Sequence, residues 1–392
     1  MAAHRRTRPR RPLRVGSATA LAFGVVASLA PAAQASAAQA PTAKTATATA
    51  KATAGHTPET RGEAGQTAPA KTSKSKTSNS KATKSTATKS TATTTNSTTQ
   101  TSASPSPPAP QAAVEGDGSY YVTSSDPQLL LDTGCQDGSA DASSGAPERL
   151  TILDFGGQYA DGSGTKPVAG PAELTNTGVE ELAENYALGW YLCTDTDRSA
   201  VLTLGVGTNN SLADVTTAGG VAWAKVVATV AAAEATVTNR VVVDGADDIE
   251  TEFSAPAAAL DWAAGYSAAG TGGYYLDYGD AGGCPKTTWD NGACNNGWNQ
   301  YDVWQVSWGE PAALPVPEIY YPGNAAQWAQ ISRYGTTGLD GPAIDFAGDL
   351  SEYAADPTTL NPVQSWAALA ATLNTPPATT QTSLTDIRYE TR

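Results

Sequence analysis

The chain has 392 residues, of which 38 are acidic and 24 are basic, and its net charge is −14 at neutral pH. Its two histidines, His4 and His56, both precede the segment that has the composition of a folded domain. This position excludes Ser-His-Asp and Cys-His catalysis and a histidine-based zinc site in that domain. No glycine motif for phosphate or dinucleotide binding occurs, and we expect neither a cofactor nor a metal.

Residues 1–40 have the pattern of an export signal. Arginines between positions 5 and 14 precede a small apolar stretch at 15–31, and Ala-Gln-Ala at 33–35 or 38–40 offers a cleavage site. Glycine, serine and proline interrupt the apolar stretch, which is too weak for a stable membrane span. Arg10-Arg11 raises a twin-arginine export route, but Pro12 and Arg14 fit it poorly and favour general secretion. No second apolar span is expected, so we predict a protein that is secreted or held by the cell wall.

Residues 41–118 form a predicted linker rich in Ala, Thr, Ser and Lys that closes with prolines. Such a composition buries too little apolar surface to offset the entropy of ordering, so we expect a disordered, proline-stiffened tether. Its nine basic and four acidic residues suggest adhesion to anionic wall polymers, but a solvated spacer is the favoured interpretation.

Residues 119–392 are predicted to form one domain, with nine basic and 34 acidic residues and a net charge of −25. This charge disfavours nucleic acid and anionic membranes as partners and suits a neutral or cationic ligand. Four cysteines in an exported chain indicate two disulfides. Cys284 with Cys294 would close a short loop, and Cys135 with Cys193 would tie the entry segment to a helix. The spacing leaves the connectivity open, and a four-cysteine metal site is disfavoured because no C-x-x-C occurs.

Strand and helix patterns alternate along this domain. Strands are predicted at 150–155, 200–205, 241–244, 274–277, 303–307, 319–321, 343–346 and 386–389. Helices are predicted at about 176–192, around Trp223, from Ser254 and Pro256, around Trp328, and from Asn361 and Pro362. Alternation over about 270 residues indicates a parallel sheet, and seven or eight units favour a closed (β/α)8 TIM-type barrel. An open sheet fits the same alternation.

Acidic residues follow several of these predicted strands. The most marked group ends the apolar strand at 241–243, where Asp248 and Glu250 stand two residues apart and, in an extended chain, share one side. Paired carboxylates supply the acid and the stabilising or attacking group that glycosidic hydrolysis needs. Crowded like charges raise carboxyl pKa values. Asp and Asn are also common turn residues, so a structural role is the alternative.

Further acids and aromatic side chains are candidates for substrate binding, because acids at strand ends would converge and aromatic faces stack on sugar rings. The candidates are Asp154, Asp277, Trp308, Tyr320 and Asp345. Tryptophans at helical positions, namely Trp223, Trp262, Trp328 and Trp366, are predicted to be core. Asp277 and Asp280 lack the remaining acids of a full calcium-binding loop, and we interpret them as a turn.

The segment Asp244-Gly-Ala-Asp-Asp-Ile-Glu250 resembles the D-G-x-D-x-D-x-E strand of chitinase-type glycosidases, one residue shorter. Its Asp248-x-Glu250 pair also resembles the acid pair of barrel-shaped cell-wall muramidases. The whole domain is similar to secreted glycoside-hydrolase-like barrels of actinobacteria. This resemblance implies that Glu250 is the general acid and that Asp248 positions or activates the sugar.

Two functions follow from these patterns. The first is a monomeric, secreted glycoside hydrolase acting on a neutral or amino-sugar polysaccharide of the peptidoglycan or chitin type. The alternative is a non-catalytic, cell-wall-associated carbohydrate-binding protein on the same scaffold. A peptidase is disfavoured, since the aspartic-protease-like Asp132-Thr133-Gly134 stands alone.

Overall fold

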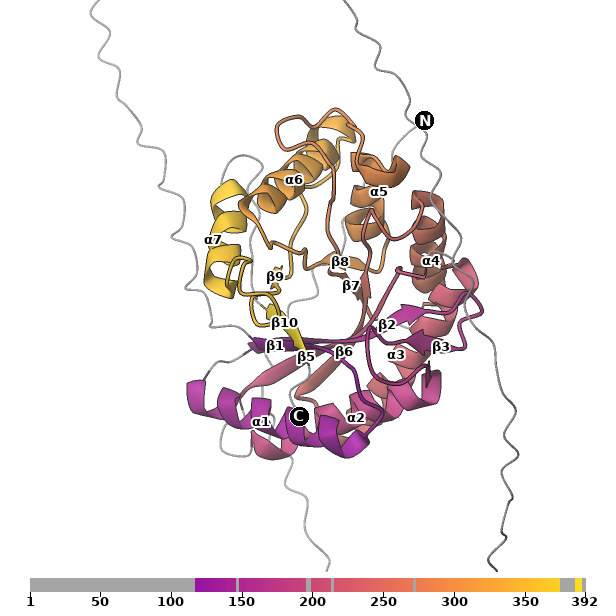
Figure 1. Cartoon of the computed structure of the whole chain (residues 1–392), viewed down its shortest axis with the longest axis vertical. Coiled ribbons are helices and arrows are strands. Elements are labelled where there is room, and N and C mark those ends of the chain that lie inside the picture. The colour runs from indigo at the N-terminus through magenta and orange to yellow at the C-terminus, as the bar shows by residue number, and fades with distance from the viewer. Residues whose placement is uncertain are drawn as a thin grey trace, which may run out of the picture. The chain divides into compact units, whose positions relative to one another are not determined.

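The computed structural model describes residues 117–145, 148–194, 199–212, 215–270, 273–373 and 385–389. The predicted export signal and all but the last two residues of the predicted linker lie outside these ranges. The described strands and helices alternate along the chain (Figure 1). The mixed α/β composition expected from the sequence is therefore confirmed.

Eight of the described strands pair in parallel with one another. They are β1 (Asp117–Tyr121), β2 (Glu148–Gln158), β5 (Val201–Asn209), β6 (Val241–Asp248), β7 (Tyr275–Asp277), β8 (Ala313–Pro315), β9 (Leu350–Ser351) and β10 (Thr385–Tyr389). Their hydrogen-bonded order is β8-β7-β6-β5-β2-β1-β10-β9. A parallel bridge between Glu318 and Leu350 joins the residues after β8 to β9. The Ile319 N–H donates to the Leu350 carbonyl at 2.8 Å, and the Leu350 N–H donates to the Pro317 carbonyl at 2.9 Å.

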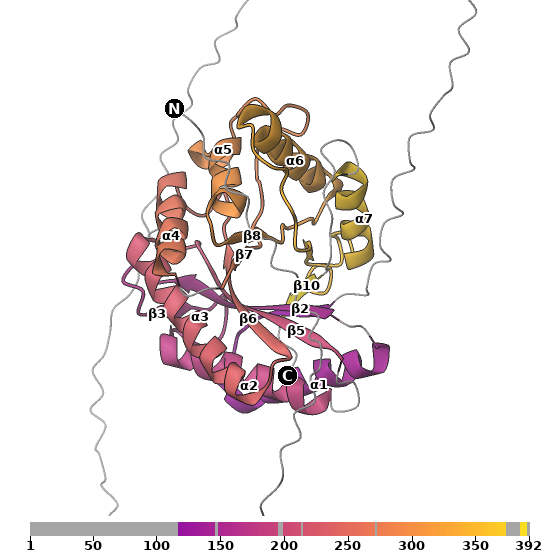
Figure 2. The ribbon, with the colours of Figure 1, turned by 180° about the vertical axis from the view of Figure 1, so that it is seen from behind.

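Seven α-helices follow successive strands. They are α1 (Pro127–Ser144), α2 (Asn176–Cys193), α3 (Thr217–Val237), α4 (Pro256–Ala269), α5 (Gln300–Trp304), α6 (Pro322–Arg333) and α7 (Pro362–Leu373). Two short strands, β3 (Gly164–Lys166) and β4 (Leu174–Thr175), pair antiparallel between β2 and α2. Figures 1 and 2 show α1, α2 and α3 beside β2, β5 and β6, with α6 and α7 on the opposite side of the strands.

Apolar side chains form two separate clusters. The larger one lies between helices and strands and includes the predicted core residues Trp223, Trp262 and Trp328, all fully buried. The smaller one is drawn from strands and the residues that extend them: Leu150, Ile152, Ala246, Leu276, Tyr278, Val316 and Leu350. Because successive strand residues point to opposite faces, this second cluster marks one face of the sheet, here called the inner face, and no described helix contributes a side chain to the cluster.

The strands predicted at 303–307, 319–321 and 343–346 are wrong. Residues 300–304 form α5, which continues as the π-helical turn η2 (Gln305–Gly309). Asn299 accepts from the Tyr301 and Asp302 N–H groups and Asp302 accepts in return from the Asn299 N–H, a capping box that starts a helix. The neighbouring strands are instead β8, which ends before 319, and β9, which begins after 346.

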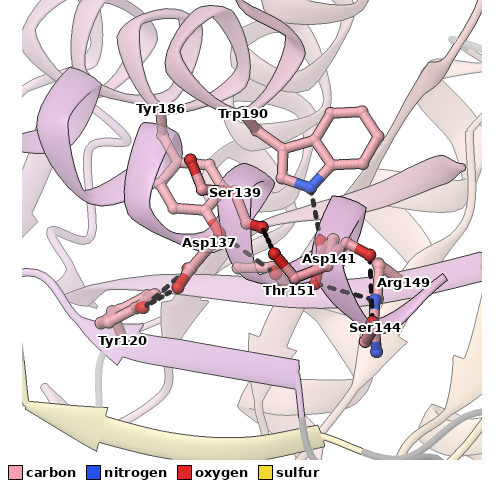
Figure 3. A network of polar contacts seen from close by, with 10 residues as sticks. Tyr120, Asp137, Ser139, Asp141, Ser144, Arg149, Thr151, Tyr186 and Trp190 are labelled. Carbon is pink, nitrogen blue, oxygen red and sulfur yellow. Dashed lines mark hydrogen bonds and ion pairs between the residues drawn. The ribbon is translucent and has the colours of Figure 1, made fainter. Parts of the chain in front are cut away.

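The strand β1 and the helix α1 were not expected from the sequence. Polar contacts hold α1 to the neighbouring elements (Figure 3). The Tyr186 hydroxyl donates to Asp137 at 2.7 Å, the Trp190 Nε1–H donates to Asp141 at 2.7 Å, and Arg149 forms an ion pair with Asp141 at 2.8 Å.

Close helix packing and a disulfide also hold α1 against α2. A Cβ on Gly189 of α2 would meet the Leu131 carbonyl oxygen at 2.0 Å, so the two backbones approach closely only because this residue is glycine. Cys135 of α1 is bonded to Cys193 of α2. The second disulfide, Cys284–Cys294, closes the loop after β7. The prediction of two disulfides is therefore confirmed.

Helix α3 is long and apolar enough to cross a membrane by length and composition. Its side chains Trp223, Val227 and Val230 are buried in the larger apolar cluster. Within the described residues α3 therefore packs as a core helix of the domain.

Candidate active site

The end of β6 positions Asp248 and Glu250. Ala246 of this strand belongs to the inner cluster, so Asp248, two residues later, points to the same inner face. The backbone at Glu250 is held by the buried side chain of Asn210, which follows β5. Asn210 Oδ1 accepts from the Glu250 N–H at 3.1 Å, and its Nδ2 donates to the Glu250 carbonyl at 3.3 Å. This asparagine fixes the chain direction at Glu250, a role that no sequence pattern indicated.

Three carboxyl groups meet at this point. One oxygen each of Asp248, Glu250 and Glu318 lies within 4.8 Å of the other two, and we call these residues the carboxyl triad. Asp248 is 5% exposed and Glu318 is 4% exposed, whereas Glu250 is partly exposed. The Asp248 Oδ1 atom is buried and has no hydrogen-bond partner among the described residues. The two acids paired by the sequence therefore converge, and a third carboxyl group joins them.

Burial and mutual repulsion raise the pKa values of the triad. Burial is the main cause of the rise in the pKa of Glu250 to about 8. Repulsion from the Asp280 carboxyl group is the next largest cause. Burial and then Glu250 raise the pKa values of Asp248 and Glu318 well above the ordinary range. Near neutral pH the triad consequently holds protons that ordinary carboxyl groups would have lost.

Asp154 in β2 lies beside the triad and is 2% exposed. Burial raises its pKa to about 6, while hydrogen bonds from the Gly156 N–H at 2.6 Å and from Asn209 oppose that rise. Repulsion from Asp154 contributes to the raised pKa values of both Asp248 and Glu250. Of the predicted substrate-binding residues, Asp154 is thus brought to the site.

Tyr320 is also brought to the site. It follows β8, and its hydroxyl donates to a Glu318 carboxylate oxygen. Across the site, the Tyr121 hydroxyl of β1 donates to Glu352 after β9 at 3.1 Å. Burial, and then repulsion from Glu318, Asp248 and Glu352, raises the pKa of Tyr121, so its phenol stays protonated and keeps the proton that it donates to Glu352.

Asp277 lies on the other face of the sheet. It alternates in β7 with Leu276 and Tyr278 of the inner cluster, and its register partner is Asp247 of β6 rather than a residue of the triad. Burial raises the pKa of Asp277 to about 8.

The structure does not bring the two remaining candidates into the triad either. Asp345 is exposed, in the segment before β9. Trp308 is half-buried in η2 and packs against the larger apolar cluster. Of the loop tryptophans, Trp298 is buried and donates to the Ser254 carbonyl at 2.8 Å, so it is a core side chain.

Glu318 and Asn210 are the site residues that sequence reasoning did not select. Glu318 directly precedes the strand predicted at 319–321, but only the strand order of the structure shows that it faces Glu250. The spacing of the triad, and of Glu250 with Glu252 and Asp280, would also suit a divalent cation, since hard cations prefer carboxylate oxygens.

Comparison with known proteins does not assign the chain to a family. No family model matches the chain, and no curated protein matches it. A solved structure, the endo-1,4-β-mannanase from Rhizomucor miehei, aligns with 70% of this chain and 85% of its own at 10% identity and a TM-score of 0.37. A likeness at this level defines neither the fold nor the activity of the chain.

Proposed function

We propose that this protein is a secreted glycoside hydrolase that acts on a neutral or amino-sugar polysaccharide, with Glu250 as general acid and Asp248 as its partner. The observation that carries the proposal is the carboxyl triad, in which the pKa of Glu250 rises to about 8. A carboxyl group that keeps its proton at neutral pH can give it to a leaving glycosidic oxygen.

The scaffold of this proposal is a closed (β/α)8 barrel. Support comes from the parallel order of eight strands, the bridge that joins the residues after β8 to β9, and the strand-only inner cluster. The triad follows the ends of β6 and β8, at the carboxyl edge where barrel enzymes carry their active groups. The predicted export signal and linker, together with two disulfides, fit an extracellular location.

The orientation of the acids favours an enzyme over a structural turn. In a simple turn, nearby backbone N–H groups would donate hydrogen bonds to the carboxyl groups. Instead Asp248 Oδ1 is buried and receives no hydrogen bond from the part of the chain that the structure describes, and oxygens of the three triad carboxyl groups lie close together. Groups with this desolvation cost and raised pKa values are concentrated at functional sites.

The test is the release of reducing ends from purified peptidoglycan and from chitin by the full chain, its Glu250→Gln variant and a Glu148→Gln control. Glu148 is exposed and is the first residue of β2, on the N-terminal side of Asp154. We expect turnover by the parent and the control and none by Glu250→Gln. Retained turnover in Glu250→Gln would contradict the assignment of Glu250 as the general acid. Binding of either polymer with no turnover in any chain would favour the carbohydrate-binding alternative.

A further inference from the structure

Glu318 faces Glu250 from across the site. Glu250 follows β6 and Glu318 follows β8, with β7 hydrogen-bonded between these strands. Two strand spacings separate their backbones by about 10 Å, yet an oxygen of each carboxyl group lies within 4.8 Å of the other. The two side chains therefore reach toward each other from separate strands. Asp248 comes from the same strand as Glu250 and lies beside it instead.

The separation of these carboxyl groups selects between two ways of breaking a glycosidic bond. Retaining glycosidases place the acid and the nucleophile about 5–5.5 Å apart, whereas inverting enzymes leave about 6.5–9.5 Å for a water molecule. The separation of no more than 4.8 Å between an oxygen of Glu250 and an oxygen of Glu318 is nearer to the retaining arrangement than to the inverting one. It is shorter than the separation of about 6.5–9.5 Å that inverting enzymes keep for the sugar and the attacking water.

The surroundings of the two groups assign their roles. The Tyr320 hydroxyl donates to Glu318, a contact that lowers the pKa of Glu318 against the effects of burial and of Glu250. A donor to a carboxylate stabilises the ionised form and fixes its orientation. Burial and acidic neighbours dominate at Glu250 and favour its protonated form. Burial and repulsion from Glu250 nonetheless raise the pKa of Glu318 well above its ordinary value. When the pair shares one proton, the hydrogen bond from Tyr320 is the contact that favours the negative charge on Glu318.

We propose that Glu318 is the nucleophile of the glycosidase proposed above, and that cleavage proceeds with retention of anomeric configuration; this inference rests on the proposed function. A Glu318 oxygen attacks the anomeric carbon while the glycosidic C–O bond breaks and the leaving oxygen takes the proton of Glu250. Water then attacks the anomeric carbon of the glycosyl ester and gives a proton to the Glu250 carboxylate. The ester bond breaks, and Glu318 is released as a carboxylate.

The test has two parts that use the polymer from which the parent releases reducing ends. Proton NMR of the first product of the unaltered chain reads the anomeric configuration, which we expect to be retained. The Glu318→Ala variant should lose at least about a thousandfold in kcat, as nucleophile variants do. Sodium azide should restore part of the turnover of Glu318→Ala, with a glycosyl azide of inverted configuration as the product identified by mass spectrometry and NMR.

Controls separate this inference from the proposed function. The Glu148→Gln variant should keep the parent rate and give no azide product. Tyr320→Phe removes a hydrogen bond to a charged acceptor, so its kcat should fall by roughly 10- to 150-fold. Parent activity with an inverted product, or an unimpaired Glu318→Ala variant, overturns the role of Glu318 while the glycosidase stands. No activity in the parent overturns both proposals. The NMR result needs no variant and does not depend on how a variant folds.

Discussion

Replacing Glu250 with glutamine should abolish turnover and stabilise the protein in a pH-dependent way. Glutamine has nearly the shape of glutamate but cannot ionise. In the folded protein the pKa of Glu250 is raised from 4.5 to about 8, chiefly by burial. The folded state therefore binds this proton more tightly than the unfolded state does. The stability associated with the proton is fully present below pH 4.5 and is lost as the pH rises to about 8.

The size of the effect follows from the same two pKa values. Each pKa unit corresponds to about 1.4 kcal/mol, so the full difference between 4.5 and 8 is about 5 kcal/mol, reached above pH 9. At pH 7 linkage gives about 3 kcal/mol, and at pH 4 the effect is close to zero. Glu250 is partly exposed, so solvent screening makes these values upper bounds. In Glu250→Gln, Asp248 and Glu318 also lose the repulsion from Glu250, which after burial is the largest cause of their raised pKa values. This loss stabilises the variant further.

Urea denaturation of the parent, Glu250→Gln and the Glu148→Gln control at pH 4, 7 and 9 measures this effect. We expect the free energy of unfolding of Glu250→Gln to exceed that of the parent at pH 7 and further at pH 9, with no difference at pH 4. The control should follow the parent at every pH. A Glu250→Gln variant less stable than the parent at pH 9, or a difference that does not change with pH, would refute the reasoning.

Three further outcomes are expected. Asp280→Asn removes the first acidic neighbour of Glu250, so the pKa of Glu250 should fall and the alkaline limb of the kcat/KM profile should move to lower pH; an unmoved limb contradicts the assignment of Glu250 as the acid. Cys135→Ser removes the disulfide that closes a 58-residue loop and should lower the free energy of unfolding by about 4 kcal/mol. Cys284→Ser opens only a 10-residue loop and should cost about 3 kcal/mol. Thermal denaturation should therefore show the larger loss for Cys135→Ser. Gly189→Ala forces a Cβ to within 2.0 Å of a carbonyl oxygen of α1, so α1 and α2 must separate and the melting temperature should drop; an unchanged melting temperature refutes the close approach.

The acid pair could be predicted because it depends on a local rule. Val241–Val243 mark a strand, and strand parity then places Asp248 and Glu250 on one side. Glu318 could not be selected by the same rule, because its strand β8 has only three residues and runs into Pro315 and Pro317. Proline lacks the N–H that a strand donates, so the sequence there does not look like a strand.

The errors in the fold have equally specific causes. Valines and tryptophan at 303–307 suggested a strand, but the capping box between Asn299 and Asp302 starts a helix there and was visible in the sequence. The helix α1 has few apolar residues, and its stability comes from contacts that a local pattern cannot show. These are the hydrogen bond from Trp190, the disulfide of Cys135 and the close approach at Gly189.

The pairing of β1 with β10 has a consequence for the order of folding. Asp117 is the register partner of Thr385, so β1 cannot pair with β10 until about 270 further residues have been synthesised. At roughly 5–20 residues per second, synthesis of that interval takes about 15–50 s. Until then β1 has an open edge, and the sheet cannot reach its final hydrogen bonding. The hydrogen bonding of the sheet is therefore completed only after synthesis has reached β10.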